Sequence, residues 1–351
     1  MKLTKAIKNK FFSSVLLGAF CLLGTAQDIH FSQASFAPLL LNPAMAGANF
    51  ANHASLIYRD QWKGAQARFK TIYTGYDQRL AEKNERGYFG VGLNVYSDKA
   101  GDALMTTTYT GLSLAYHVRL NKFQTLGLAA QPSFGQRSLD FNALSWGLQY
   151  DGDGYNSALP TGEPLNGPNQ FGFFDINAGL VYTYKSSEKY MTANDQRAFN
   201  VGYSLNHINQ PKYSFYKQDN ERLYMKHVFF ANAVIGMNNS KLSFMPALYG
   251  MLQGNQKEFL AGIYFRYSMQ DKSVYTALKK GAAFSLGTFY RFGDAFVAKG
   301  LVEWSNWAMG FAYDLNLSSY TAATNGRGGF ELTLRFVSPN PFGSSGSKSR
   351  I

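Results

Sequence analysis

Apolar residues alternate with small or polar residues along most of this chain. The run YFGVGLNVY, Tyr88 to Tyr96, is the clearest case, with Phe, Val or Leu at every second position and Gly or Asn between them. The same alternation recurs in residues 174–184, 199–207, 307–315 and 329–336. Because successive side chains of a strand point to opposite faces, this period of two predicts β-strands. We expect about 14 strands, each long enough to cross a membrane at a tilt, and no helix of useful length.

The composition of the two strand faces distinguishes a membrane barrel from a soluble sandwich. A sandwich would carry charge on its outer face, yet only 16% of the chain is charged and the second face is mostly Gly, Ser, Thr and Asn. Phe, Tyr and Trp make up another 16%, many of them near the ends of segments, as in the aromatic girdles of membrane barrels. Strands can cross a bilayer only in a closed barrel. The sequence therefore predicts an all-β fold, a transmembrane antiparallel β-barrel over residues 52–337, with the sandwich as the alternative.

The first 26 residues have the pattern of an export signal. Four lysines precede an apolar run from Phe11 to Leu23, and the small residues Gly24-Thr25-Ala26 follow. The run is too short for a transmembrane anchor, which needs about 20 apolar residues. We expect cleavage after Ala26, export, and a final location in the outer membrane of the cell.

Cleavage changes the charge and the cysteine content of the chain. The only cysteine, Cys21, would be lost, which leaves no thiol for a disulfide or a metal site. The net charge would fall from +12 to +8, because the signal contains four lysines and no acidic residue. The remaining basic residues are scattered, which argues against nucleic acid as a partner. Anionic lipid of the outer membrane, or an acidic protein face, is the expected partner.

Two segments interrupt the strand pattern, and a third follows it. Residues 141–170 are rich in Gly, Asn, Asp and Pro, and residues 207–222 form a second break. With an even number of strands and a periplasmic amino terminus, we expect long loops such as the first outside the cell. Residues 338–351 predict a flexible tail.

Motifs for catalysis or for a cofactor are not evident. None of the five histidines has a metal-ligand spacing. Asp151 and Asp153 resemble the start of a calcium loop, but Tyr155 and Asn156 stand where such a loop needs an oxygen ligand and a glycine. We predict no catalytic, cofactor-binding or metal-binding residues. A barrel lipase with Ser and His on neighbouring strands stays open as an alternative.

Charged residues within the strands are expected to point into the lumen, because an Arg or Lys facing lipid at the midplane costs about 2–4 kcal/mol. We expect these residues to form a network that fills and stiffens the barrel. The candidates are Arg59, Asp77, Arg266, Arg291, Asp314, Glu331 and Arg335.

Motifs near both ends of the chain carry a resemblance to a known family. HFSQ at residues 30–33, LNPAMAG at 41–47 and YRDQW at 58–62 lie near the amino end. GTFYRFGDAF at 287–296, GFAYDLNLS at 310–318 and GGFELTLRF at 328–336 lie near the carboxyl end. Together they resemble the PorP/SprF family, outer-membrane proteins of the type IX secretion system in Bacteroidetes. The motif residues singled out are His30, Phe31, Ser32, Gln33, Asn42, Pro43, Ala44 and Gly47.

The resemblance implies a non-enzymatic role in secretion. Some members of this family are implicated in export itself, and others pair with one surface protein, such as a gliding adhesin. The expected function is therefore to export or anchor a large surface protein by binding its C-terminal domain. The alternatives are a core structural part of the secretion or gliding machinery that contacts periplasmic ring proteins, or a passive channel. Other components of the system are possible partners.

The stretch HFSQASFAPLLLNPAMAG, residues 30–47, fits neither a strand nor a free tail. Pro38 and Pro43 remove donors from any strand ladder, and the segment is too apolar to remain in water. We expect residues 27–51 to fold back and plug the periplasmic mouth of the barrel, anchored by Leu39, Leu40 and Leu41, with a turn at Asn42-Pro43. A disordered lead, or a docking site for a periplasmic partner, is the alternative.

Overall fold

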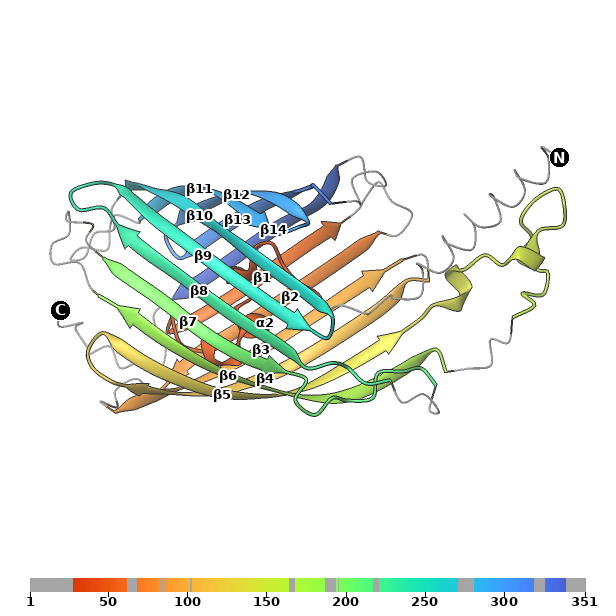
Figure 1. Ribbon diagram of the computed structural model, residues 1–351, viewed down its shortest axis with the longest axis horizontal. Coiled ribbons are helices and arrows are strands. Elements are labelled where there is room, and N and C mark those ends of the chain that lie inside the picture. The colour runs from red at the N-terminus through yellow and green to blue at the C-terminus, as the bar shows by residue number, and fades with distance from the viewer. Residues whose placement is uncertain are drawn as a thin grey trace, which may run out of the picture.

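A computed structural model gives the arrangement of the strands (Figure 1). The structure describes residues 28–61, 68–81, 84, 86–101, 103–163, 168–186, 194, 196–216, 221–270, 281–318 and 326–338. The expected signal peptide, residues 1–26, lies outside the described residues, as does the expected tail after Ser338. Among the described residues, no helix is long and apolar enough to cross a membrane.

Fourteen strands in the described chain form one closed barrel in which each strand pairs antiparallel with its neighbours in the sequence. The strands are β1 (Asn52–Gln61), β2 (Phe69–Leu80), β3 (Gly87–Ala100), β4 (Met105–Arg119), β5 (Gln124–Ser138), β6 (Gln170–Lys185), β7 (Arg197–Asn206), β8 (Lys226–Gly236), β9 (Leu242–Gln253), β10 (Gln256–Gln270), β11 (Ala282–Arg291), β12 (Ala295–Trp304), β13 (Trp307–Asn316) and β14 (Arg327–Ser338).

The seam between β1 and β14 closes the sheet and leaves no strand edge unpaired. Ten residues of β1 pair in register from Asn52↔Ser338 to Gln61↔Gly329. Closure matters because an unpaired backbone N–H or C=O group in a bilayer costs several kcal/mol. The predicted all-β transmembrane barrel is confirmed, with the predicted number of strands.

The two faces of the strands differ as the alternation predicts. On β3, Phe89 and Leu93 are 53% and 49% exposed on the outside, whereas Gly90, Gly92 and Asn94 point inward. The outward side chains are apolar and suit contact with lipid. The inward side chains are small or polar.

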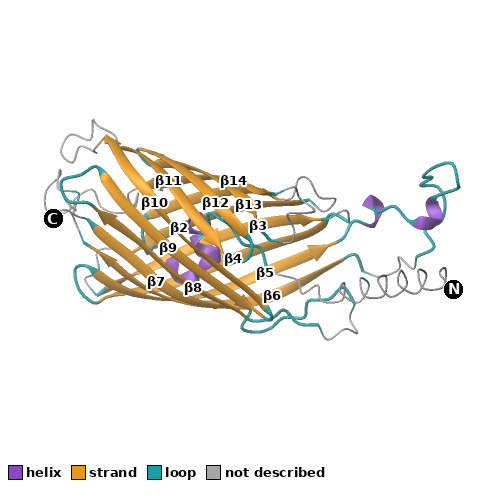
Figure 2. Cartoon of the chain, turned by 45° about the horizontal axis from the view of Figure 1, so that its top comes forward, coloured by secondary structure: helices purple, strands orange, loops and turns teal. Residues whose placement is uncertain are grey.

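Short helical turns lie inside the barrel, in the segment before β1 (Figure 2). They are η2 (Ala34–Phe36), α2 (Pro38–Leu41) and η3 (Pro43–Met45). Proline begins both α2 and η3, where its missing N–H costs nothing. Asn42 ends α2 in an extended conformation, and its side chain caps η3 by accepting a hydrogen bond from the Ala44 N–H at 2.8 Å.

The barrel has two distinct mouths. Because the strands are antiparallel, the β5–β6 and β7–β8 connections lie at the same mouth, opposite the one where β1 begins and β14 ends. We call the mouth with the β5–β6 and β7–β8 connections the long-loop mouth. The β5–β6 loop contains η4 (Phe141–Ala143) and η5 (Gly147–Gln149) and projects well beyond the strands (Figure 1, yellow to green).

Which face of a strand contacts lipid can be tested by placing a charged side chain on that face. Leu93 lies midway along β3 and is 49% exposed on the outer face. Leu93→Arg should lower the free energy of unfolding in lipid vesicles by about 2–4 kcal/mol, because the guanidinium would face hydrocarbon. Denaturant titration measures the change, with Leu93→Ile as the control. An unchanged stability would contradict the assignment of this face to lipid.

Candidate functional site

Residues 28–50, here named the lumen segment, run along the interior of the barrel from one mouth to the other. Asp28 contacts His207, which directly follows β7 at the long-loop mouth. Gly47 contacts Arg79 near the opposite mouth, where β1 begins. The segment thus contacts wall residues near both mouths. That it plugs the periplasmic mouth stays a prediction.

Ser32 lies at the centre of a buried ionic cluster, which we name the Ser32 cluster. Its hydroxyl donates to Asp314 at 2.7 Å and accepts hydrogen bonds from Arg59 at 3.2 Å and Arg291 at 2.6 Å. Arg291 pairs with Asp314 at 3.0 Å, and Arg59 pairs with both Asp314 and Glu331. All five residues are no more than 2% exposed, so each charge is paired away from water.

The backbone of the lumen segment belongs to the same cluster. The two carboxylate oxygens of Glu331 accept hydrogen bonds from the N–H groups of Ser32 and Gln33, at 2.6 and 2.8 Å. Glu258 extends the cluster along the wall, since it pairs with Arg291 at 3.4 Å and with His30 at 3.2 Å. The cluster therefore joins the HFSQ motif to strands β1, β10, β11, β13 and β14.

The imidazole of His30 is uncharged at neutral pH. Burial lowers its pKa well below the usual value, and the positive charges of Arg291, Arg59 and Lys226 lower it further. A neutral His30 faces the Glu258 carboxylate without adding another buried cation.

The Asn-Pro turn docks against β6 and β7. The Asn42 amide donates to the carbonyl oxygens of Leu180 and Tyr203, at 2.9 and 3.1 Å. Pro43 and Ala44 follow in η3 and are buried. Phe31, the remaining aromatic of the motif, packs edge-on against Tyr73 with ring centroids 5.8 Å apart.

Asp77 holds the far end of the lumen segment. One carboxylate oxygen accepts a hydrogen bond from the Gly47 N–H at 2.9 Å, and the other lies 2.7 Å from His53 Nδ1. Arg79 donates to the carbonyl oxygens of Gly47 and Ala48, at 2.9 and 3.0 Å. Gly47 itself has φ +68°, a conformation that favours glycine.

The candidates Arg266 and Arg335 form a separate group. Both pair with Glu303, at 2.5 and 3.2 Å. Arg335 also stacks beneath the rings of Phe36 and Phe50, at 5.3 and 5.5 Å from the centroids. The seven charged candidates thus fall into three places: the Ser32 cluster, the Asp77 end and the Glu303 pair.

A further ionic contact, which we name the mouth latch, fixes the start of the segment. His207 lies between two carboxylates, with Nε2 2.7 Å from Asp28 and Nδ1 2.8 Å from Asp175. Lys226 Nζ lies 3.5 Å from the same oxygen of Asp28. His207 has φ +59°, which is uncommon for a residue other than glycine and places the ring between the two acids.

The mouth latch is an ion pair at neutral pH. Burial opposes protonation of His207, but the carboxylates of Asp28 and Asp175 outweigh it and raise the pKa to about 9. Burial likewise opposes ionisation of Asp28, yet His207 and Lys226 hold its pKa well below the usual value. Each partner therefore carries charge near pH 7.

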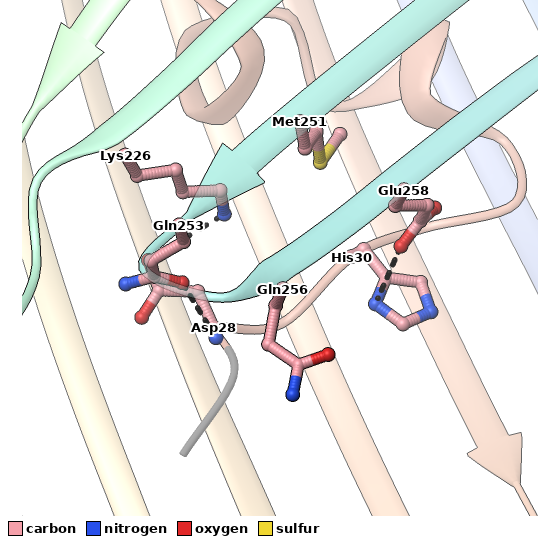
Figure 3. Close-up of a pocket in the computed structure, with 7 residues that line it drawn as sticks. All are labelled: Asp28, His30, Lys226, Met251, Gln253, Gln256 and Glu258. Atoms are coloured by element: carbon pink, nitrogen blue, oxygen red, sulfur yellow. Dashed lines mark hydrogen bonds and ion pairs between the residues drawn. The ribbon is translucent and has the colours of Figure 1, made fainter. Parts of the chain in front are cut away.

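Little empty space remains around the start of the lumen segment. One cavity of about 10 Å³ is lined by Asp28, His30, Lys226, Glu258 and neighbouring residues of β9 and β10 (Figure 3). A second cavity, of about 20 Å³, lies beside Ile29 and Leu40. Each has room for about one water molecule, so neither is a substrate pocket.

Wall glycines make room for the segment. A Cβ on Gly90 would collide with the Ala46 carbonyl oxygen, and one on Gly179 would collide with Asn42. Gly92, Gly202 and Gly310 are similarly close to Leu39, Asn42 and Gln33. The small inward residues of the strand pattern therefore lie where the segment packs, and the lumen is shaped to it.

Several contact residues were not identified from the sequence: Asp28, Asp175, His207, Glu258 and Glu303. Glu258 and Glu303 could have been identified in the sequence, since each is an acidic residue within a strand.

Asp151 and Asp153 lie in a tight turn in which the Asp151 carboxylate accepts hydrogen bonds from the N–H groups of Asp153 and Gly154, both at 3.1 Å. Among the described residues, no group of three or more His, Asp or Glu side chains could hold a metal ion.

The mouth latch should weaken in alkali. Since the pKa of His207 is raised to about 9 from 6.5, its stabilisation is fully present below pH 6.5 and is lost as pH rises through 9. Amide protection of residues 28–33, corrected for intrinsic exchange, should fall at least tenfold between pH 7 and pH 10. Hydrogen exchange with mass spectrometry measures this. His207→Gln should show low protection at both pH values; an equal fall in that variant would exclude His207 as the cause.

Bulk at a wall glycine should displace the segment. Gly90→Val would force the Ala46 carbonyl away, whereas Gly300→Val, on β12, meets open space and serves as the control. Chymotrypsin should cleave within residues 28–50 at least tenfold faster in Gly90→Val, at a cost in stability of about 1–3 kcal/mol. Equal cleavage of the two variants would mean that the contact at Gly90 does not hold the segment.

Comparison with known proteins gives the family. No curated protein sequence matches the chain. Among solved structures, the TodX monoaromatic hydrocarbon channel deltaS2 mutant is 12% identical with a TM-score of 0.45, over 86% of this chain and 92% of that one. The CymD monoaromatic hydrocarbon channel is 10% identical with a TM-score of 0.44, over 90% and 95%. Such distant likenesses say nothing about function. The family model described as "Type IX secretion system membrane protein PorP/SprF" matches residues 23–336, and this chain belongs to that family.

Proposed function

We propose that this protein is a non-enzymatic outer-membrane barrel of the type IX secretion system. It helps to export a large surface protein, or holds it at the surface, by binding its C-terminal domain. The observation that carries the proposal is membership of the PorP/SprF family over residues 23–336. The lumen segment supports a plug role, because it occupies the interior along its length. The client would therefore bind at a mouth and not within the barrel.

The β5–β6 loop is the best candidate for the client-binding surface. Leu148, Tyr150 and Tyr155 are 68%, 61% and 47% exposed on this loop, beyond the strands that contact lipid. Tyr150 and Tyr155 are held together by a backbone bridge, with ring centroids 5.8 Å apart. Exposed aromatic and aliphatic side chains that gather on a loop are typical of protein interfaces.

The charge of the same loop indicates the chemistry of the client. Residues 139–169 include Asp140, Asp151, Asp153 and Glu163, but no lysine or arginine, although the whole chain is basic. A client domain that fits this loop would place basic side chains around an apolar patch. Its binding should weaken at high salt, because the exposed pairs would be screened.

A second candidate is a core structural part of the secretion machinery, in contact with its periplasmic components. Family membership supports association with such components as well. Deletion of the gene separates the two functions. Loss of one surface protein would favour the dedicated anchor, whereas loss of every secreted substrate would favour the structural part.

The client-binding loop can be tested in the native cells. A tagged protein purified in mild detergent should bring down one very large surface protein in near-equal amount, identified by mass spectrometry. Replacing Leu148, Tyr150 and Tyr155 together by serine should reduce that recovery at least fivefold, because the apolar contact would be lost. The matched control replaces Leu120 and Phe123, 54% and 47% exposed at the opposite mouth, by serine.

Two results would count against the anchor. Recovery of no large surface protein would contradict client binding, and undiminished recovery with the triple variant would contradict the assignment to this loop. Recovery of periplasmic components alone would favour the structural role.

A further inference from the structure

The wall of the barrel contacts the backbone of the lumen segment at many points, in addition to the side-chain contacts described above. Glu331 accepts from the N–H groups of Ser32 and Gln33, and Asp77 accepts from that of Gly47. Wall side chains also contact backbone carbonyl oxygens along the segment. These are Gln131 to Leu39 at 3.3 Å, Ser204 to Leu41 at 2.8 Å, His117 to Ala46 at 2.8 Å, and Arg79 to Gly47 and Ala48 at 2.9 and 3.0 Å.

These contacts come from one contiguous part of the barrel wall, between β14 and β7. Glu331 lies on β14, Asp77 and Arg79 on β2, His117 on β4, Gln131 on β5 and Ser204 on β7. Backbone recognition of this kind is how proteins bind peptides of another chain, with pockets for a few side chains giving specificity. Here the pockets take Phe31, Phe36, Leu39, Leu41 and Met45, all of which are buried.

Inward glycines of the wall also leave space for the segment. The inward glycines Gly90, Gly92, Gly179, Gly202 and Gly310 belong to β3, β6, β7 and β13. A Cβ at each would meet an atom of the segment. The cavity is thus set by residues of the barrel and not only by the segment that occupies it.

The covalent link between segment and barrel is a single point of the chain, between Phe50 and β1 at Asn52. The hydrogen bonds, ion pairs and apolar contacts described above are noncovalent and lie upstream of that link. Cutting the link removes none of them.

We propose that the lumen is a peptide-binding site whose resident ligand is the lumen segment, and that a free peptide of residues 28–50 occupies it in trans. The ligand class is a mainly apolar peptide with an Asn-Pro turn, recognised through its backbone by Glu331, Asp77, Arg79 and their neighbours. This site is distinct from the proposed client surface on the β5–β6 loop.

The test uses the mature chain, folded with its segment in place. A protease recognition sequence is inserted between Phe50 and Ala51, and the purified barrel is cut after folding. We expect the cut segment to stay bound through gel filtration. After mild denaturant and return to buffer, a fluorescein-labelled peptide of residues 28–50 should bind at least tenfold more tightly than a scrambled peptide, measured by anisotropy.

Wall variants locate the site. Glu331→Gln weakens charge-assisted hydrogen bonds to two N–H groups and should lower affinity for the labelled peptide at least tenfold. Asp98→Asn neutralises a carboxylate on β3 that accepts a hydrogen bond from Thr71 on β2 at 2.6 Å, and should change affinity less than threefold. The uncut barrel, whose own segment competes, should not take up the peptide.

Three outcomes would overturn the proposal. One is immediate loss of the cut segment with no rebinding of the labelled peptide. Another is equal binding of the scrambled peptide, and the third is equal effects of Glu331→Gln and Asp98→Asn. Client recovery from cells uses the uncut protein, so its failure would leave this result unaffected.

Discussion

Fourteen tilted strands enclose more space than their own inward side chains can fill, and this constraint shapes the interior of the protein. Barrels of about 8 strands are filled by side chains, whereas those of 16–18 strands keep an aqueous channel. Here the lumen segment occupies the interior in place of water. Its short helical turns α2 and η3, each of which begins with proline, pack against inward glycines. The small inward residues of the strands thus leave the room that the segment occupies.

The buried charges fix the position of the segment. Burying two arginines and two acids costs several kcal/mol for each ion, which is recovered only when every group is paired with good geometry. The Ser32 hydroxyl and the N–H groups of Ser32 and Gln33 supply part of that pairing. Without the segment, Glu331 and Asp314 would keep only their wall partners. The ion cluster therefore favours one register of the segment over any shifted one, a specificity that apolar packing alone would not give.

The fold could be predicted from the sequence because the alternation of apolar and polar residues is a local signal. The site could be predicted only in part. The run from Tyr88 to Tyr96 shows both the strand and the side that faces lipid. Arg59 and Asp314 were expected inside because charge is costly in lipid. Their meeting with Ser32 was not predictable, since Ser32 lies 282 positions from Asp314 and no local pattern links them. His207 was missed for another reason: it was taken as the last residue of an alternating run, whereas the strand ends at Asn206, so alternation does not determine the direction of its side chain.

The direction of the lumen segment has a consequence for how the chain is made. Ser32 lies near the amino end of the chain, which is synthesised first, and Glu331 lies near the carboxyl end, 299 positions later. Either the seam between β1 and β14 closes around the segment, or the segment is drawn through a finished cylinder. In both cases the residues that are synthesised first reach their final place only after those that are synthesised last.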